Sequence, residues 1–401
     1  MNSRWRQYLA CIAFSQFLSM TAFSAAYTFM PFYFKKIGVP NDRLSWYVAL
    51  FASVGNIGFA VAAPVWGSLA DRYGRKLMLL RANFAAALLM PILGLITDPD
   101  LLVCHRFFLG ALTGTVTAAQ TLILGTAPAE RRTFALGVHA SSIFSGTMVG
   151  QFSGGLVSWL GFQQTFLLSG VMLAVAGLLA LPVHEAKFAA APAPKKTERK
   201  SGIFGFGKVW YLFALFVAMT VARDMDAPFI PIVVDEIMQD HDLALRWSGY
   251  IFGCCSAVAI VMGSVTGWIA DRTKILTVLL VTVFLSGILR LPQIFAASVG
   301  ALLIERCLLS AAICGIEPLL QSWLAAVTPE KEHGRIFGFA GLFKGIGWSV
   351  GPLVGNACIA LFGGQVRAVI AASMVMMILL VPVIKLLAAK LPPPERRRKK
   401  A

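Results

Sequence analysis

The chain has 401 residues, of which 58% are hydrophobic and only 13% are charged, and its mean hydropathy is +0.75. This balance excludes a soluble globular protein, because so much apolar surface would have no aqueous face to complement it. The formal net charge of +16 would suit nucleic-acid binding, but the charge lies mostly in short segments between long apolar runs. We therefore expect a membrane protein without a nucleic-acid partner.

The first apolar run extends from Tyr8 to Phe34, 27 residues without one charged side chain. About 20 residues are enough for a helix to cross a hydrocarbon core of ~30 Å, so this run can span with some tilt. It is too long for the apolar part of a secretory signal and lacks a cleavage-site pattern. We predict a retained first membrane helix.

The same criterion predicts twelve spans along the chain. Helices are expected because a backbone in contact with lipid must satisfy its own hydrogen bonds. The predicted spans are residues 8–34, 46–67, 77–96, 100–124, 135–156, 165–182, 209–234, 247–268, 275–295, 298–325, 336–362 and 367–388.

Lys and Arg residues are distributed unequally between the two sides of the predicted bundle. Of the 35, 24 lie in or beside segments assigned to the inside, 5 in or beside segments assigned to the outside, and 6 within spans. Positive charge is retained on the cytoplasmic side, so both termini are predicted to be cytoplasmic. The basic tail at residues 396–400 is expected to contact anionic lipid as well.

Cysteines and glycines give no sign of enzymatic chemistry. All seven cysteines lie inside predicted spans, so we expect small buried side chains rather than disulfides or a metal site. We find no nucleophile–base pair and no phosphate-binding glycine loop between a strand and a helix. The chain is predicted to be no enzyme and to need no cofactor.

The landmarks of the first half recur in the second at an offset of 200 or 201 residues. The sequence predicts an N-terminal six-helix bundle at 1–182, a cytoplasmic linker at 183–208, a C-terminal six-helix bundle at 209–390 and a basic tail at 391–401. A parallel repeat of this kind places a substrate site near mid-membrane. The matching pairs are Pro31 and Pro231, Asp71 and Asp271, Arg106 and Arg306, Gln120 and Gln321, and Pro128 and Pro329.

A charged, glycine-rich loop follows the second predicted span and recurs in eroded form at 267–272. Gly67 would let the helix end approach a neighbour closely. Asp71 can accept hydrogen bonds from a helix N-terminus, where a carboxylate is favoured. The defining residues of the loop are Gly67, Asp71, Arg72, Gly74, Arg75 and Lys76.

Glycines four residues apart form a ladder in both the fifth and the eleventh predicted spans. Small residues at this spacing let two helices touch along their backbones. The first ladder consists of Gly146, Gly150 and Gly154, followed by Gly155. The second consists of Gly347, Gly351 and Gly355, with Pro352 after its middle glycine. Gln151 stands in the first ladder where Pro352 stands in the second.

Together these motifs resemble the major facilitator superfamily, in particular bacterial multidrug-efflux permeases of the drug:proton antiporter branch. The run from Pro64 to Leu80 is similar to one that occurs in those permeases. The resemblance implies a cytoplasmic (inner) membrane protein whose 67–76 loop acts as a conformational latch. It also implies that the first ladder is the antiporter motif, with Gln151 in place of proline. In Arg106-x-x-x-Gly110, the arginine is implied to take part in proton coupling.

Acidic residues well inside the spans are confined to the second half of the chain, since Asp100 lies at the very edge of the fourth span. A charge in a bilayer helix is costly, which makes each a functional candidate. Arg223 and Asp226 are three residues apart and are predicted to pair on one helix face, leaving Asp224 free to meet Arg306 or a proton. Asp224 and Asp226 are the leading proton-coupling candidates, and the others are Arg223, Arg106, Glu305 and Arg306.

Other polar residues within spans are candidates for the substrate cavity. Glu317 and Lys344 are predicted to pair across neighbouring helices, and Ile143 replaces Lys344 in the first half. Each polar residue can equally serve as a helix–helix contact. The cavity candidates are Gln16, Tyr27, Asn56, Gln120, His139, Glu317, Gln321 and Lys344.

The leading prediction is a monomeric, proton-driven exporter of amphipathic small molecules. One alternative is a selective carrier of an organic anion or metabolite, in which Arg106, Arg306 and Lys344 bind carboxylate or phosphate. A second alternative is a membrane sensor that keeps the bundle and does not transport.

Overall fold

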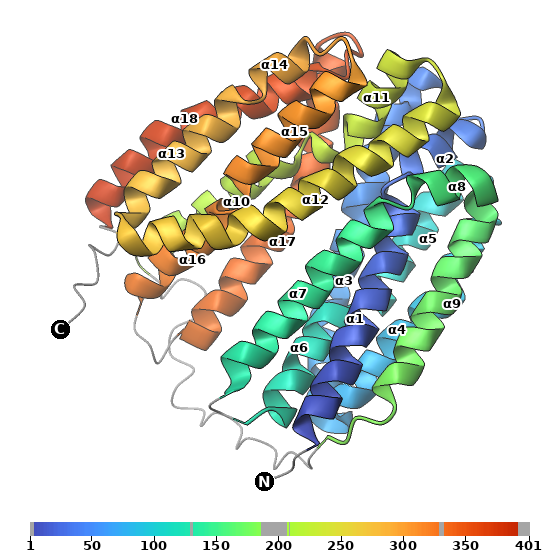
Figure 1. Ribbon diagram of the computed structural model, residues 1–401, viewed down its shortest axis with the longest axis vertical. Helices are drawn as coiled ribbons and strands as arrows, with labels where there is room; N and C mark the ends of the chain where they lie inside the picture. The colour runs from blue at the N-terminus through green and yellow to red at the C-terminus, as the bar shows by residue number, and fades with distance from the viewer. Residues whose placement is uncertain (1–3, 129–130, 186–206, 208, 329–332, 392–401) are drawn as a thin grey trace. The chain divides into compact units, whose positions relative to one another are not determined.

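The computed structural model describes residues 4–128, 131–185, 207, 209–328 and 333–391 (Figure 1). Every regular element in these residues is a helix. The chain divides into two compact units, Met1–Ala193 with Gln239–Ser256, and Pro194–Met238 with Ala257–Ala401. The predicted linker and the predicted basic tail lie almost entirely outside the described residues.

The first unit contains nine complete helices among its described residues. They are α1 (Trp5–Tyr27), α2 (Met30–Lys36), α3 (Asn41–Tyr73), α4 (Arg75–Leu93), α5 (Pro99–Leu112), α6 (Thr115–Thr126), α7 (Arg132–Gln151), α8 (Gly154–Leu160) and α9 (Phe162–Ala180).

The second unit repeats this order, with α12 contributing residues to both units. Its helices are α10 (Trp210–Asp224), the short 3₁₀ helix η4 (Ala227–Phe229), α11 (Ile230–Met238), α12 (His241–Arg272), α13 (Ile275–Ile288), α14 (Leu291–Ile294), α15 (Val299–Ile313), α16 (Ile316–Ala326), α17 (His333–Leu361) and α18 (Ala368–Lys390).

Several predicted spans are broken rather than continuous. The first separates into α1 and α2 just before Pro31, and the seventh separates into α10, η4 and α11, with Pro228 and Pro231 in the new segments. A proline has no N–H to donate and clashes with the preceding turn, so a helix restarts at it more easily than it continues. The break after α10 decides how the charged residues nearby are paired.

Ten of the described helical segments are long and apolar enough to cross a membrane. The fifth and seventh predicted spans are not among them: α7 holds several Ser and Gly residues, and α10 has only 15 residues. Leu88, Trp159 and Leu361 are each at least 75% exposed, and such bare apolar surface suits contact with lipid.

Helix packing follows the same plan in each unit. In the first, α1 packs against α7 and α4 against α9; in the second, α10 packs against α17 and α13 against α18. Figure 1 shows α1 beside α7, and α13 beside α18. The internal repeat read from the sequence is therefore visible in the way the helices pair.

The glycine ladders lie at these helix contacts. A Cβ atom on Gly146 would collide with the Phe17 carbonyl of α1, and one on Gly150 with the Thr21 carbonyl. In the second unit, a Cβ on Gly347 would lie 2.6 Å from the side chain of Thr220 of α10. The ladders thus permit a backbone separation that any larger residue would prevent.

Candidate ion and substrate sites

Asp226, a fully buried carboxylate of the second unit, lies between two arginines. Its Oδ2 is 2.7 Å from Arg306 Nη2, and its Oδ1 is 3.6 Å from Arg290 Nη2. Arg290 is also fully buried and donates to the carbonyl oxygens of Ser286 at 2.7 Å and Arg223 at 2.9 Å. Removing one member would leave an uncompensated charge away from water, so breaking this network would destabilise the unit.

The predicted pairing of Arg223 with Asp226 is wrong. Arg223 instead binds its neighbour Asp224 through two hydrogen bonds, Nε to Oδ1 at 2.9 Å and Nη2 to Oδ2 at 2.7 Å. The three-residue spacing argument requires a continuous helix, and α10 ends at Asp224. The bend that follows turns Asp226 away, so that Asp226 rather than Asp224 meets Arg306.

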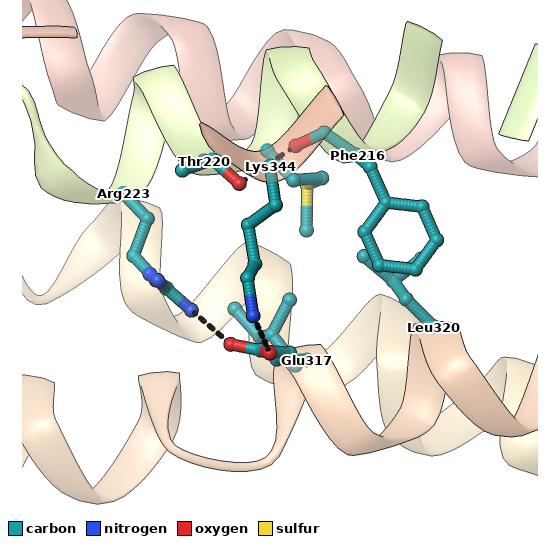
Figure 2. A pocket seen from close by; sticks show the side chains of 8 residues that line it. Phe216, Thr220, Arg223, Glu317, Leu320 and Lys344 are labelled. Carbon is teal, nitrogen blue, oxygen red and sulfur yellow. Dashed lines mark hydrogen bonds and ion pairs between the residues drawn. The ribbon is translucent and has the colours of Figure 1, made fainter. Parts of the chain in front are cut away.

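A second charged cluster is centred on Glu317, at the start of α16 (Figure 2). Lys344 Nζ lies 2.6 Å from Glu317 Oε1, which is the cross-helix pair that the sequence predicts. Arg223 Nη1 is 3.6 Å from Glu317 Oε2, and Gln321 Nε2 donates to Oε1 at 3.2 Å. Three side chains from three helices therefore hold one carboxylate in place.

Trp348 contacts both Asp224 and Lys344 and so belongs to the same cluster. Its indole N–H donates to Asp224 Oδ2 at 3.0 Å, while its ring centroid lies 4.8 Å from Lys344 Nζ. The charged side chains are 16% to 31% exposed, so the cluster is accessible, unlike that around Asp226. With two cations and two carboxylates, it is neutral as it stands.

A small cavity of about 10 Å³ lies against the Glu317 cluster. It is lined on one side by Arg223, Glu317 and Lys344 and on the other by apolar side chains that include Phe216 and Leu320. Figure 2 shows Arg223 and Lys344 pointing toward Glu317, with Phe216 and Leu320 on the opposite side. This volume holds about one water molecule.

Glu305 on α15 differs from the other intramembrane acids. It is partly buried, and within the described part of the chain its Oε2 has no hydrogen-bond partner and its side chain makes no ion pair. Asp224, Asp226 and Glu317 are each within 2.7 Å of a cation. Protonating Glu305 breaks no ion pair, whereas protonating any of the other three would.

In the first unit, Arg106 of α5 lies over aromatic rings instead of a carboxylate. Its guanidinium carbon is 4.1 Å from the Tyr27 ring centroid and 5.3 Å from that of Phe51. Gly55 of α3 provides the space, because a Cβ there would collide with the guanidinium, and Gly110 fits against the Gly55 backbone in the same way. Arg106 thus makes a cation–π contact, and Gly110, four residues later, lets α5 pack closely on α3.

An open groove of about 900 Å³ lies along α1 and α7 of the first unit. Phe14 and Phe17, whose rings stack at 5.9 Å, line it together with Ser141, Ser142 and Ser145. None of these residues was predicted as a cavity residue. The run of serines in an apolar span was the signal that could have indicated them.

Several predicted cavity residues do not line this groove. Gln16 and His139 are buried to 0% and 1% exposure. Tyr27 lies under Arg106, and Asn56 donates to the carbonyl of Ala52 in its own helix. Gln120 is exposed. Only Glu317, Gln321 and Lys344 of the predicted set come together at one place.

The predicted 67–76 loop is helical except at Gly74, because α3 continues to Tyr73 and α4 begins at Arg75. The segment is attached to a carboxylate that the sequence did not indicate. Glu185, just beyond α9, accepts hydrogen bonds from the backbone N–H groups of Arg75 at 3.0 Å and Lys76 at 2.9 Å. Lys76 Nζ donates to the carbonyl of Leu181 at 2.6 Å. Gly74 has φ of +98°, which a side chain would strain, and a Cβ there would lie 2.9 Å from Glu185. Glu185 thus caps α4, the task expected of Asp71 at a helix N-terminus.

The predicted roles of Gly67 and Asp71 in this segment are not supported by the described residues. A Cβ on Gly67 would meet nothing within 4 Å, so the described residues show no close helix approach there. The side chain of Asp71 lies outside the described part of the structure. Arg72 is exposed.

Gln151, the departure from the ladder pattern, makes a polar contact within the first unit. Its Oε1 accepts a hydrogen bond from Ser256 Oγ of α12 at 2.5 Å. A proline at this position would lack that acceptor. A Cβ on Gly154 would meet the Leu245 carbonyl at 2.6 Å, whereas one on Gly155 would meet nothing within 4 Å.

Comparison with known sequences identifies proteins of multidrug resistance. A multidrug resistance efflux pump PmrA homolog from Lactococcus lactis is 28% identical over 374 residues, and the alignment covers 92% of each chain. The multidrug resistance protein MdtG of Salmonella typhimurium is 30% identical over 376 residues, again 92% of each chain. Both are named as drug-resistance proteins.

Solved structures with the same fold are also transporters. A bacterial homolog of the human lysosomal transporter Spinster, inward-facing and occupied, superposes with a TM-score of 0.75 at 13% identity and covers 98% of both chains. The nucleoside transporter NupG gives a TM-score of 0.73 at 14% identity and covers 96% of this chain and 99% of its own. At these identities the likeness shows the fold alone.

The family model described as Major Facilitator Superfamily matches residues 12–299 and 276–401. These matches leave little of the chain outside them, and they agree with the helix pairing, the repeat and the efflux-pump relatives. The protein is a multi-pass transporter of the bacterial inner membrane, not an enzyme, and it belongs to the Major Facilitator Superfamily.

Proposed function

We propose that the protein exports amphipathic small molecules in exchange for protons by alternating access. An efflux-pump relative at 28% identity and a multidrug resistance protein at 30% identity, each over nearly the full chain, support export of such compounds. The proposal includes twelve spans with both termini in the cytoplasm, of which α7 with α8, and α10 with α11, would supply the fifth and seventh.

The unpaired carboxylate of Glu305 is the observation that supports proton coupling. A coupling group must gain and lose a proton in each cycle, and the least costly one is a carboxylate that breaks no ion pair when it is protonated. Among the four acids well inside the predicted spans, Glu305 has that property, whereas Asp224, Asp226 and Glu317 are paired. It also precedes Arg306, so its charge state changes the field at the Asp226 network, one residue away along α15.

The remaining charged residues would have distinct tasks. Asp226, Arg290 and Arg306 form a buried network that keeps its charges through the cycle and fixes α15 against the end of α10. Arg223 and Asp224 stay paired and orient the Glu317 cluster. Arg106, held over two rings, would support the helix contact between α3 and α5 rather than carry a proton.

The groove along α1 and α7 would offer the apolar body of a substrate a neutral surface. The stacked Phe14 and Phe17 present aromatic area, and three serines supply hydrogen-bonding groups that rotate to suit different ligands. Such a surface binds by area and shape more than by fixed polar contacts, which suits a broad substrate range.

Everted membrane vesicles with an acidic interior test the proposal. Lipophilic cations, neutral drugs and organic anions would be added in turn while a pH-sensitive dye reports the internal pH. We expect the native protein to release protons on addition of several unrelated compounds, and a Glu305→Gln variant to release none. The same variant should still exchange labelled substrate across the membrane without a gradient, because it keeps the binding surfaces.

The matched control is Asp242→Asn, which removes an exposed acid at the start of α12 and should behave like the native protein. Proton release that persists in Glu305→Gln but disappears in Asp224→Asn would move the coupling site to Asp224. A response to one organic anion alone would refute broad export.

A further inference from the structure

We propose that Glu317, Lys344 and Trp348 form a binding site for the protonated amine of an amphipathic substrate, and that the Lys344 ammonium occupies this site when no substrate is bound. The proposal rests on the export function above and names the class of compound for one part of the substrate site.

Lys344 shows how an ammonium group is recognised here. Its Nζ lies 2.6 Å from Glu317 Oε1 and 4.8 Å from the Trp348 ring centroid. A carboxylate that accepts the N–H groups and an aromatic face that attracts the positive charge together form the usual recognition site for an organic cation. The ammonium of a substrate would make the same two contacts.

The exposure of the cluster favours a cation over an anion. The side chains of Asp224 and Glu317 are 31% and 28% exposed, against 16% for Arg223 and 21% for Lys344. The negative groups are therefore the more accessible ones. If Lys344 turns away, Arg223, Asp224 and Glu317 together carry one net negative charge, which a monovalent cation neutralises.

Glu317 is held in place without Lys344. Arg223 at 3.6 Å and Gln321 at 3.2 Å remain as its partners. The Lys344 side chain has four flexible carbons and can rotate out of the site. Glu317 would lose several contacts if it moved, so Lys344 is the easier of the two to displace. An anionic ligand would have to displace Glu317 from all of them, so exchange of one ammonium for another is the easier event.

The cavity explains why the two ammonium groups compete. Its volume of about 10 Å³ leaves no room for a substrate beside the lysine side chain. Phe216 and Leu320 line the opposite wall and would contact the apolar part of the ligand next to its amine. The site is thus expected to take a primary or secondary amine joined to an apolar chain or ring.

Calorimetric titration of the purified full-length protein in lipid nanodiscs tests this site. The probes are phenylbutylamine, phenylbutyrate and phenylbutanol, which share one apolar body and carry a positive, a negative and no charge. We expect Lys344→Met to bind phenylbutylamine about tenfold more tightly than the native protein, since a charge-assisted hydrogen bond no longer has to be displaced. Glu317→Gln should weaken the binding of phenylbutylamine by at least about tenfold and leave that of phenylbutanol unchanged.

Two further variants keep the test decisive. Lys385→Met makes the same chemical change at an exposed lysine of α18 and should bind all three probes like the native protein. Lys344→Gln serves if Lys344→Met does not fold, with the same expected gain. Weaker binding of phenylbutylamine, or loss of phenylbutyrate binding, in the Lys344 variants would overturn the proposal and favour an anion site. Because binding is measured without a gradient, failure of proton coupling would leave this result intact.

Discussion

Arg106 and Arg306 occupy equivalent places 200 residues apart, yet the two units compensate the guanidinium in different ways. Arg106 lies over the rings of Tyr27 and Phe51, and no carboxylate pairs with it in the described residues. Arg306 lies 2.7 Å from the buried Asp226. The repeat has kept the cation and its helix but not the group that neutralises it.

The same contrast extends to the Glu317 cluster. At the offset of 200 or 201, Phe23 corresponds to Arg223, Ser24 to Asp224 and Ile143 to Lys344. The first unit therefore presents a neutral surface of rings and serines, and the second unit presents ion pairs that can be rearranged. Because of this difference, we expect the second unit to bind the protons and any charged part of the substrate.

The largest effect is expected from Asp226→Asn. The change leaves Arg290 and Arg306 buried without their counter-charge, and breaking a buried pair in this way costs about 3–5 kcal/mol of unfolding free energy. Denaturant unfolding in detergent, followed by circular dichroism, measures the loss. Asp242→Asn is the control and should stay within about 0.5 kcal/mol of the native protein. A loss below about 1 kcal/mol for Asp226→Asn would contradict the structural role of the network.

A smaller effect is expected at the first arginine. Tyr27→Phe keeps the ring under Arg106 and removes only a hydroxyl that has no partner in the described residues, so its stability should be close to native. Tyr27→Leu removes the ring. Combined with Arg106→Met in a double-mutant cycle, it should show a coupling of about 1–2 kcal/mol. A coupling near zero would mean that the ring does not compensate Arg106, and the comparison between the two units would fail.

Sequence reasoning was most successful where a residue pattern acts locally or repeats. Long uncharged runs predicted most of the helices, and the 200-residue offset predicted the shared packing plan. The Glu317–Lys344 pair was also predicted, from the position of both residues in the inner halves of neighbouring spans, although Glu317 lies at the start of α16 and not within a continuous helix.

It failed where the chain leaves regular helix. The bend after Asp224 is set by how Pro228 and Pro231 restart the chain, and it reversed the expected partners of Arg223 and Arg306. Arg290 gave no sign of its task, since its partner is defined only by that bend. Glu185 fell in the predicted linker, where composition alone gives no reason to expect a specific contact.

The smallest effect, and the one that extends the comparison, is expected from Glu185→Gln. In the first unit this carboxylate binds the N–H groups of Arg75 and Lys76 rather than an arginine side chain. A charged cap on a helix N-terminus contributes about 1 kcal/mol, so its amide should loosen the start of α4 without unfolding the protein.

Hydrogen exchange measured by mass spectrometry would report faster exchange in the first turn of α4 and no change in α13, the corresponding helix of the second unit. Glu185→Ala should give a larger increase at the same place, because it removes the acceptor as well as the charge. If α4 exchanges at the native rate in both variants, Glu185 does not hold the loop, and the latch must depend on other contacts. If only α4 responds, the first unit neutralises Glu185 with backbone N–H groups, just as it neutralises Arg106 with rings.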